Sequence, residues 1–145
     1  MSERSNDGTD VRQLLLRRAR SAAERAYAPY SRFLVGAVVE ADDGSLHEGA
    51  NIENASYGLT ICAERAAIFS AVAAGHRRFR RIAVTCQIGP ASRIDERTPC
   101  GPCRQVMAEF MAPDAEVLID GVGSFRLEEL LPLAFRLGPG QEPGR

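Results

Sequence analysis

The stretch Pro99-Cys100-Gly101-Pro102-Cys103 decides how the rest of this sequence is interpreted. It lies at the predicted start of a helix, and so does a second cysteine motif, Cys62-Ala63-Glu64. Unpaired amides and the positive end of the helix dipole favour the thiolate form of a cysteine at such a position. A closed structural zinc site takes four protein ligands, whereas a catalytic one takes three and keeps a position open. The sequence therefore predicts that Cys62, Cys100 and Cys103 are metal ligands.

Glu64 favours a catalytic site over a structural one. It follows Cys62 by two residues in the first turn of the expected helix, so its carboxylate can lie beside the metal without binding it and exchange protons there. The alternative is a structural zinc site with Cys86 as the fourth ligand, which would make the chain a binding module without turnover. Cys86 lies in an apolar run and is expected to pack in the core instead.

Hydrophobic spacing outside these motifs predicts a hairpin followed by alternating helices and strands. Helices are expected over about 10–26, 63–74 and 102–111, and strands over about 33–39, 45–50, 81–86, 116–119 and 124–126. Asp42-Asp43-Gly44 is a hairpin-turn signal, and Pro113-Asp114 is expected to turn the chain into the fourth strand. This order is typical of an α/β fold in which helices cover both faces of one mixed sheet.

Length and composition bound the class of protein. A chain of 145 residues fits one domain, which we expect over 9–136 with flexible tails at 1–8 and 137–145. Hydrophobic residues at 45% and charged residues at 26% exclude a wholly disordered or collagen-like chain. The net charge of −1 provides no global field for nucleic acid or an anionic membrane, and neither is an expected partner. The polar N-terminus predicts a cytoplasmic protein with reduced cysteines.

Five blocks of sequence occur in an order that resembles a known family. The blocks are 28–37, 51–55, 57–65, 99–105 and 130–135. Together they resemble, over about residues 26–135, the small homo-oligomeric cytidine deaminases of nucleoside salvage, whose signature joins a Cys-x-Glu element to Pro-Cys-x-x-Cys. The resemblance implies a three-layer α/β/α sandwich with a mixed five-stranded sheet. It also implies a homotetramer whose subunits share their sites, with one Zn²⁺ held by Cys62, Cys100 and Cys103 of each subunit.

The same resemblance implies hydrolysis of cytidine and deoxycytidine to uridine and deoxyuridine plus ammonia, with Glu64 as proton shuttle. Asn51 and Glu53 correspond to the pair that hydrogen-bonds the sugar 3′-hydroxyl, where a carboxylate would repel a 3′-phosphate and so disfavour a polynucleotide substrate. The other implied contacts are the Phe33 ring on the base, the Ala63 amide on the pyrimidine edge, the Thr98 carbonyl near the leaving amine, and Tyr57 and Phe135 lent by neighbouring subunits.

Three thiolates and one Zn²⁺ sum to a charge of −1, which would weaken the metal as a Lewis acid. Arg65, which matches the family's arginine in that role, is expected to compensate by donating to the thiolates, and we extend the same expectation to Arg104. The alternative substrate is a cytosine nucleoside antibiotic, since the chain also resembles blasticidin S deaminases around its cysteines. Asn51 and Arg65 favour the ordinary nucleoside. His47 and His76 are expected at the surface.

Overall fold

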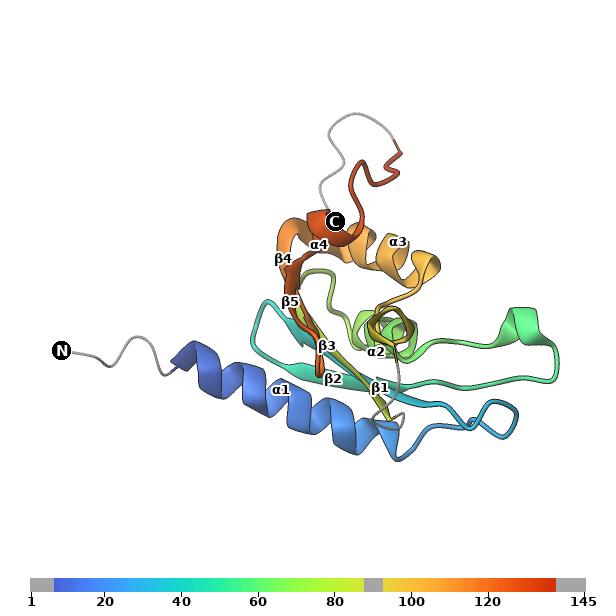
Figure 1. The fold of residues 1–145 in the computed structure, drawn as a ribbon. Helices are drawn as coiled ribbons and strands as arrows, with labels where there is room; N and C mark the ends of the chain where they lie inside the picture. The colour runs from blue at the N-terminus through green and yellow to red at the C-terminus, as the bar shows by residue number, and fades with distance from the viewer. Residues whose placement is uncertain (1–6, 88–92, 138–145) are drawn as a thin grey trace.

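The computed structural model describes residues 7–87 and 93–137, and its elements follow the predicted order closely (Figure 1). The helices are α1 (Asp7–Ala23), α2 (Ala63–Ala73), α3 (Gly101–Phe110) and the single turn α4 (Leu127–Leu130), with 3₁₀ turns at Tyr57–Leu59 and Ile94–Glu96. The strands are β1 (Leu34–Ala41), β2 (Leu46–Ala50), β3 (Phe79–Gln87), β4 (Met111–Ile119) and β5 (Gly123–Arg126). None of the helices in this part of the chain is long and apolar enough to cross a membrane.

The five strands form one mixed sheet in the order β2-β1-β3-β4-β5. β3 and β4 pair in parallel and the other neighbours are antiparallel. Figure 1 shows α1 along one face of the sheet and α2 and α3 on the other. The smaller core cluster packs α1 against the sheet, and the larger one lies between the sheet and the α2–α3 face. The predicted α/β/α sandwich with a five-stranded mixed sheet is confirmed.

Two glycines let helices approach the sheet more closely than any side chain would allow. A Cβ at Gly36 in β1 would lie 2.0 Å from the Ala19 carbonyl oxygen of α1. A Cβ at Gly49 in β2 would lie 2.2 Å from the Ala67 nitrogen and 2.6 Å from the Ala63 oxygen of α2. The absence of a side chain at Gly49 thus sets the position of α2, the helix that begins immediately after Cys62.

Several predicted boundaries need correction. α1 begins at Asp7 and ends at Ala23, so Asp7 and Gly8 belong to the helix rather than to the expected tail. Leu137 of the expected C-terminal tail is described and exposed, and residues 1–6 and 138–145 lie outside the described residues. The turn expected at Pro113-Asp114 lies inside β4, where the pairing jumps from Phe79↔Met111 to Arg81↔Glu116. β4 therefore bulges between these pairs and exposes Pro113, which needs no ladder partner there.

Candidate metal centre and active site

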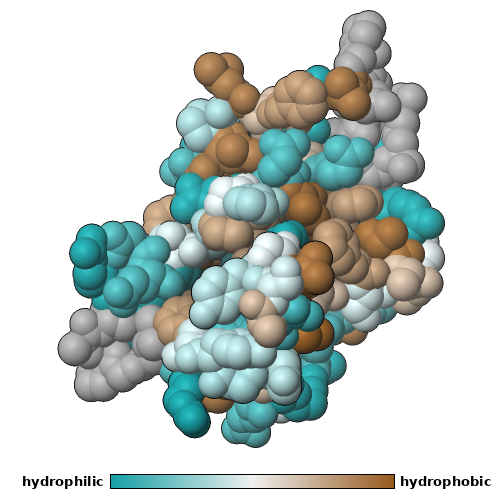
Figure 2. Space-filling view, turned by 90° about the vertical axis from the view of Figure 1, so that its right-hand side faces the viewer, coloured by the Kyte–Doolittle hydropathy of each residue, from teal (hydrophilic) through white to brown (hydrophobic). Residues whose placement is uncertain are grey.

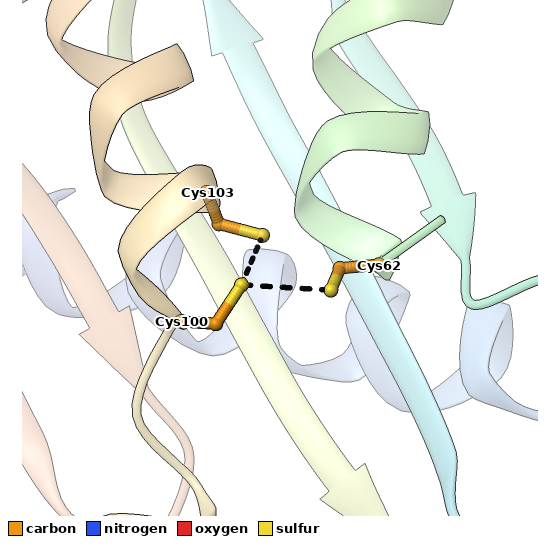
Figure 3. A group of neighbouring side chains, drawn as sticks. All are labelled: Cys62, Cys100 and Cys103. Atoms are coloured by element: carbon orange, nitrogen blue, oxygen red, sulfur yellow. Dashed lines mark hydrogen bonds between the residues drawn. The ribbon is translucent and has the colours of Figure 1, made fainter. Parts of the chain in front are cut away.

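Two helix starts bring the three cysteines together. Cys62 is the N-cap of α2, Cys100 is the N-cap of α3, and Cys103 lies in the first turn of α3 behind Pro102, a residue suited to a helix start. The Sγ atoms of Cys62 and Cys100 are 3.6 Å apart and those of Cys100 and Cys103 3.2 Å apart (Figure 3). Within the residues described, this is the one group of three metal-ligating side chains.

The sulfur positions fit a zinc ion. All three Sγ atoms lie within 4.8 Å of one another. A tetrahedral ion with Zn–S bonds of about 2.3 Å requires sulfurs about 3.8 Å apart, so only small side-chain rotations separate the observed arrangement from that geometry. Cys86 lies outside the group, and the alternative of a closed site with Cys86 as fourth ligand finds no support in this geometry. The three thiols thus leave one position of a tetrahedron open.

Arg65 lies where the predicted charge compensation needs it. Its Nη2 donates to the Cys62 Sγ at 3.4 Å, and its Nε is buried with no hydrogen-bond partner in the described part of the chain. The pKa of the Cys62 thiol is lowered to about 5, chiefly by the hydrogen bond from Cys103 and then by the Arg65 guanidinium. Arg65 therefore lies within hydrogen-bond distance of one of the three sulfurs, and its role in charge compensation stays a prediction.

Arg104 does not share this role, and the expectation that it donates to the thiolates is wrong. Its Nε donates to the Pro99 carbonyl and its Nη1 to the Leu130 carbonyl, each at 2.7 Å. The guanidinium is occupied by these two backbone acceptors, so it ties the turn before Cys100 to the end of α4. Arg104 holds the backbone of the cysteine motif in place rather than its sulfurs.

A pocket of about 270 Å³ opens beside the thiols. Glu64 lies in its wall and is 5% exposed. Burial, with a smaller contribution from the charge of Cys62, raises the pKa of Glu64 to about 7. A carboxyl group with that pKa can both accept and donate a proton near neutral pH, which is the property that general acid–base chemistry needs.

The pocket lining also includes Glu53, which is held in place by a short loop. Its carboxylate accepts hydrogen bonds from the backbone amides of Tyr30 and Ser31, at 3.0 and 3.1 Å, and from the Ser31 hydroxyl at 2.5 Å. The bond from the Ser31 hydroxyl is the main cause that lowers the pKa of Glu53. Glu53 is therefore a fixed negative charge at the pocket wall. Sequence reasoning did not single out Ser31, whose spacing from Glu53 carries no signal.

Asn51 is a second fixed polar group, buried to 7% exposure. Its Oδ1 accepts from the Val35 amide at 2.8 Å and its Nδ2 donates to the Phe33 carbonyl at 2.7 Å. The side-chain amide thus provides hydrogen-bond partners for the backbone of Phe33 and Val35, as a neighbouring strand would. One Nδ2 proton remains for another acceptor. Asn51 thus has a structural role that the sequence did not reveal.

The structure places most, but not all, of the predicted contact residues in this pocket. Phe33, Asn51, Glu53, Ala63 and Thr98 all line it, together with Cys62, Glu64 and Cys100. Lining residues that the sequence analysis did not propose are Ser31, Val35, Thr60, Ile61, Cys86, Glu96 and Arg97.

Two of the predicted contact residues depart from this arrangement, and Cys86 belongs to it. Tyr57 and Phe135 are 77% and 67% exposed and do not line the pocket of their own chain. Cys86 is half-buried against the core as expected, and it also faces the pocket, where burial raises the pKa of its thiol to about 12. It is a neutral wall residue.

Comparison with known sequences adds independent findings. Residues 9–119 match the family model described as the cytidine and deoxycytidylate deaminase zinc-binding region. A cytidine deaminase of Halalkalibacterium halodurans is 48% identical over 128 residues, which are 86% of this chain and 93% of that protein. One from Mycobacterium tuberculosis is 47% identical over 120 residues, 82% of this chain and 85% of that protein.

Solved structures agree. A crystal structure of cytidine deaminase from Burkholderia pseudomallei superposes with a TM-score of 0.76 at 46% identity, covering 85% of this chain and 98% of that one. The cytidine deaminase structure from Mycobacterium tuberculosis gives a TM-score of 0.75 at 42% identity, covering 86% of this chain and 97% of that one.

Proposed function

The chain belongs to the cytidine and deoxycytidylate deaminase family, and we propose that it converts cytidine and deoxycytidine to uridine and deoxyuridine, with release of ammonia, in pyrimidine salvage. The cytidine deaminase class predicted from the sequence and the zinc cofactor agree with the comparisons and with the thiol cluster. The observation that carries the proposal is the juxtaposition of the buried Glu64 carboxyl with three converging thiols in one nucleoside-sized pocket.

Zinc, held by Cys62, Cys100 and Cys103, would supply an activated water nucleophile at neutral pH. Glu64 accepts a proton as that water adds to C4 of the cytosine ring, and passes it to ring N3. It then takes the remaining proton from the new hydroxyl and gives it to the 4-amino group. The C4–N bond breaks with its electron pair on nitrogen, so that ammonia leaves and the C4 carbonyl of uridine forms.

The other wall of the pocket supplies sugar recognition. We assign the free Nδ2 proton of Asn51 and the Glu53 carboxylate to the 3′-hydroxyl. Because Glu53 is held as an anion by Ser31, a phosphate at that position would be repelled. The pocket is thereby suited to free nucleosides and unsuited to an internal position of DNA or RNA. The Phe33 ring is assigned to stack on the base.

The first experiment follows the loss of cytidine absorbance with zinc-loaded protein. We expect Glu64→Gln to reduce kcat by about 10²–10⁴-fold with zinc retained, because acid–base groups contribute that much. Glu109→Gln, an exposed glutamate on α3, is the matched control and should keep full activity. Blasticidin S serves as a second substrate. Turnover of blasticidin S but not of cytidine would refute the nucleoside assignment while leaving the proton shuttle intact.

A second experiment addresses the sugar wall. Cytidine, deoxycytidine and cytidine 3′-phosphate are compared by kcat/KM in the native enzyme and in Glu53→Gln. The native enzyme should have a high kcat/KM for cytidine and deoxycytidine and a low one for cytidine 3′-phosphate. Glu53→Gln should bring these values closer together, because it lowers kcat/KM for the two nucleosides and raises it for the phosphate. Equal kcat/KM for all three substrates in the native enzyme would contradict the assignment of Glu53 to the 3′-hydroxyl.

We also infer a homotetramer with shared sites. The segment 52–59 projects to the right in Figure 1 and carries exposed Ile52, Tyr57 and Leu59. Apolar side chains reach the surface on the face shown in Figure 2, which looks onto that side of the molecule. Exposed apolar groups on a projecting segment are typical of a subunit contact. This supports Tyr57 as a residue lent to a neighbouring pocket, and we propose the same role for Phe135, which is 67% exposed.

Light scattering after gel filtration tests the tetramer. We expect a mass of four chains, and we expect Tyr57→Ala to raise KM for cytidine even though Tyr57 lies outside its own pocket. A fully active monomer would contradict the inference.

A further inference from the structure

The two histidines of this chain come together at a place remote from the thiols. His47 lies in β2 and His76 follows α2, and their ring centroids are 4.7 Å apart. Cys62 precedes the first residue of α2, so the 11 residues of that helix, about 16 Å at 1.5 Å per residue, separate the two places. Both imidazoles are half-buried and face one another rather than standing separately at the surface as expected. The catalytic chemistry makes no use of them.

Their ring nitrogens converge on a single point. The Ser45 Oγ lies 3.1 Å from the His47 Nε2 and 3.3 Å from the His76 Nε2. The same hydroxyl lies 2.6 Å from the Asp43 Oδ1, which also accepts the Ser45 amide at 2.9 Å. A hydroxyl has one proton, and the short contact to the carboxylate claims it. Ser45 therefore donates to neither imidazole, and its oxygen can only accept from their Nε2 atoms, so binding of a metal has to displace the Nε2 proton of each ring.

Asp43 supplies a carboxylate beside this point. Its Oδ2 lies 3.9 Å from the His76 Nδ1, while its Oδ1 is held by Ser45, and its side chain is 60% exposed. This distance is an ion-pair contact and longer than a hydrogen bond. A carboxylate that hydrogen-bonds Nδ1 keeps the ring proton there and leaves the Nε2 lone pair for a metal, which is the usual support of a metal-binding histidine. The two imidazoles are donors suited to late first-row divalent ions, and Asp43 would act as support rather than as a third ligand.

We propose that His47 and His76 form a second metal site, for a divalent ion of the nickel–zinc type, with Asp43 as the supporting carboxylate. Metal–imidazole bonds are about 2.0–2.1 Å long, so each Nε2 has to move by about 1 Å toward the point that the Ser45 hydroxyl now occupies, while that hydroxyl rotates aside. The bound ion joins β2 to the segment after α2. The site is independent of the thiol cluster and of the proposed reaction.

The test is a calorimetric titration of Ni²⁺ into protein whose thiol cluster already holds one measured equivalent of zinc. We expect about one further ion per chain and a melting temperature that rises with Ni²⁺ concentration. His47→Gln and His76→Gln should each weaken binding by about tenfold or more, with folding checked by circular dichroism. Ser45→Ala removes an oxygen but no ligand, so it should bind Ni²⁺ within about threefold of the native protein and keeps the test informative if a histidine variant fails to fold.

A charge-matched pair completes the design. Asp43→Asn should weaken Ni²⁺ binding by about tenfold, whereas Asp42→Asn removes the same charge one residue away and should not. Binding that survives in both histidine variants, or that falls equally in the two aspartate variants, would overturn the assignment. So would the absence of a second equivalent in the native protein.

Discussion

We expect Gly49→Ala to damage the active site from outside it. The new Cβ would lie 2.2 Å from the Ala67 nitrogen and 2.6 Å from the Ala63 oxygen, both backbone atoms of α2. Ordinary contact begins at 3.4 Å, so the helix or the strand has to give by about 1.2 Å, the difference between 3.4 and 2.2 Å. Forcing an extra methyl group into such a contact costs about 1–3 kcal/mol.

This displacement reaches the chemistry because α2 begins between Cys62 and Glu64. A shift of about 1 Å in a reacting group costs on the order of 10²-fold in rate. The variant should therefore melt about 2–12 °C lower, at about 2–4 °C per kcal/mol for a chain of this size. It should also lose about tenfold to a hundredfold in kcat for cytidine and hold zinc less tightly, since Cys62 moves relative to the cysteines of α3.

Two further glycines separate stability from catalysis. In Gly36→Ala the new Cβ would lie 2.0 Å from the Ala19 oxygen of α1, so this variant should lower the melting temperature to a similar extent as Gly49→Ala. Its kcat should stay within about twofold of the native value, because α1 carries no part of the site. Gly8→Ala has open space around its Cβ and should be neutral or slightly stabilising. Scanning calorimetry and cytidine turnover measure both quantities. A Gly49→Ala enzyme with native melting temperature and native kcat would refute the reasoning.

Three other variants test individual contacts. Asn51→Ala leaves the Val35 amide and the Phe33 carbonyl without their partner, at a cost of about 1–3 kcal/mol each. The free energy of unfolding measured in urea should therefore fall by more than in a surface alanine variant. Arg104→Ala frees two carbonyls near the cysteine motif, and competition with a chelator should strip zinc from it faster than from the native protein; an unchanged rate would contradict its backbone role. The pKa of Asp120 is lowered from its ordinary value of 3.8, chiefly by the hydrogen bond from Arg20. The ionised pair therefore stabilises the folded protein at pH values above 3.8. This stabilisation is lost as the pH falls through the lowered pKa of the folded state. Asp120→Asn should melt about 1–3 °C below the native protein at pH 7, and the gap should close toward pH 3.

The parts of the site that the sequence predicts are those set by neighbouring residues. Cys62 and Cys100 lie at helix starts because of local chain signals, and Arg65 reaches the Cys62 sulfur because it stands three residues later, one helical turn along the same face. Arg104 follows a cysteine just as directly. Its acceptor, however, is the Leu130 carbonyl, 26 residues away, whose position only the folded chain determines.

The errors in the fold have the same origin. Pro113 is a turn signal by composition, but its surroundings depend on the parallel pairing of β4 with β3, whose paired residues lie 32 to 35 positions earlier in the chain. The loop that fixes Glu53 through Ser31 is likewise a contact between segments 22 residues apart. Local patterns predict helix starts and strands, whereas the partners of polar side chains follow from the tertiary fold.

The topology explains why one face of one sheet can hold such a site. Val35 at the start of β1 pairs with Cys86 at the end of β3, and the pocket lies over this pair. Because α3 connects β3 to the parallel strand β4, it begins near that same end of β3, and α2 begins there too, so the amino ends of two helices point at one volume (Figure 3). Their positive ends favour the thiolate form of Cys62, whose pKa is lowered to about 5, and the Arg65 guanidinium donates a hydrogen bond to the same sulfur. The negative charge that a zinc–thiolate centre would carry here is therefore offset from two sources: the amino ends of α2 and α3, which a change of side chain does not remove, and the Arg65 guanidinium.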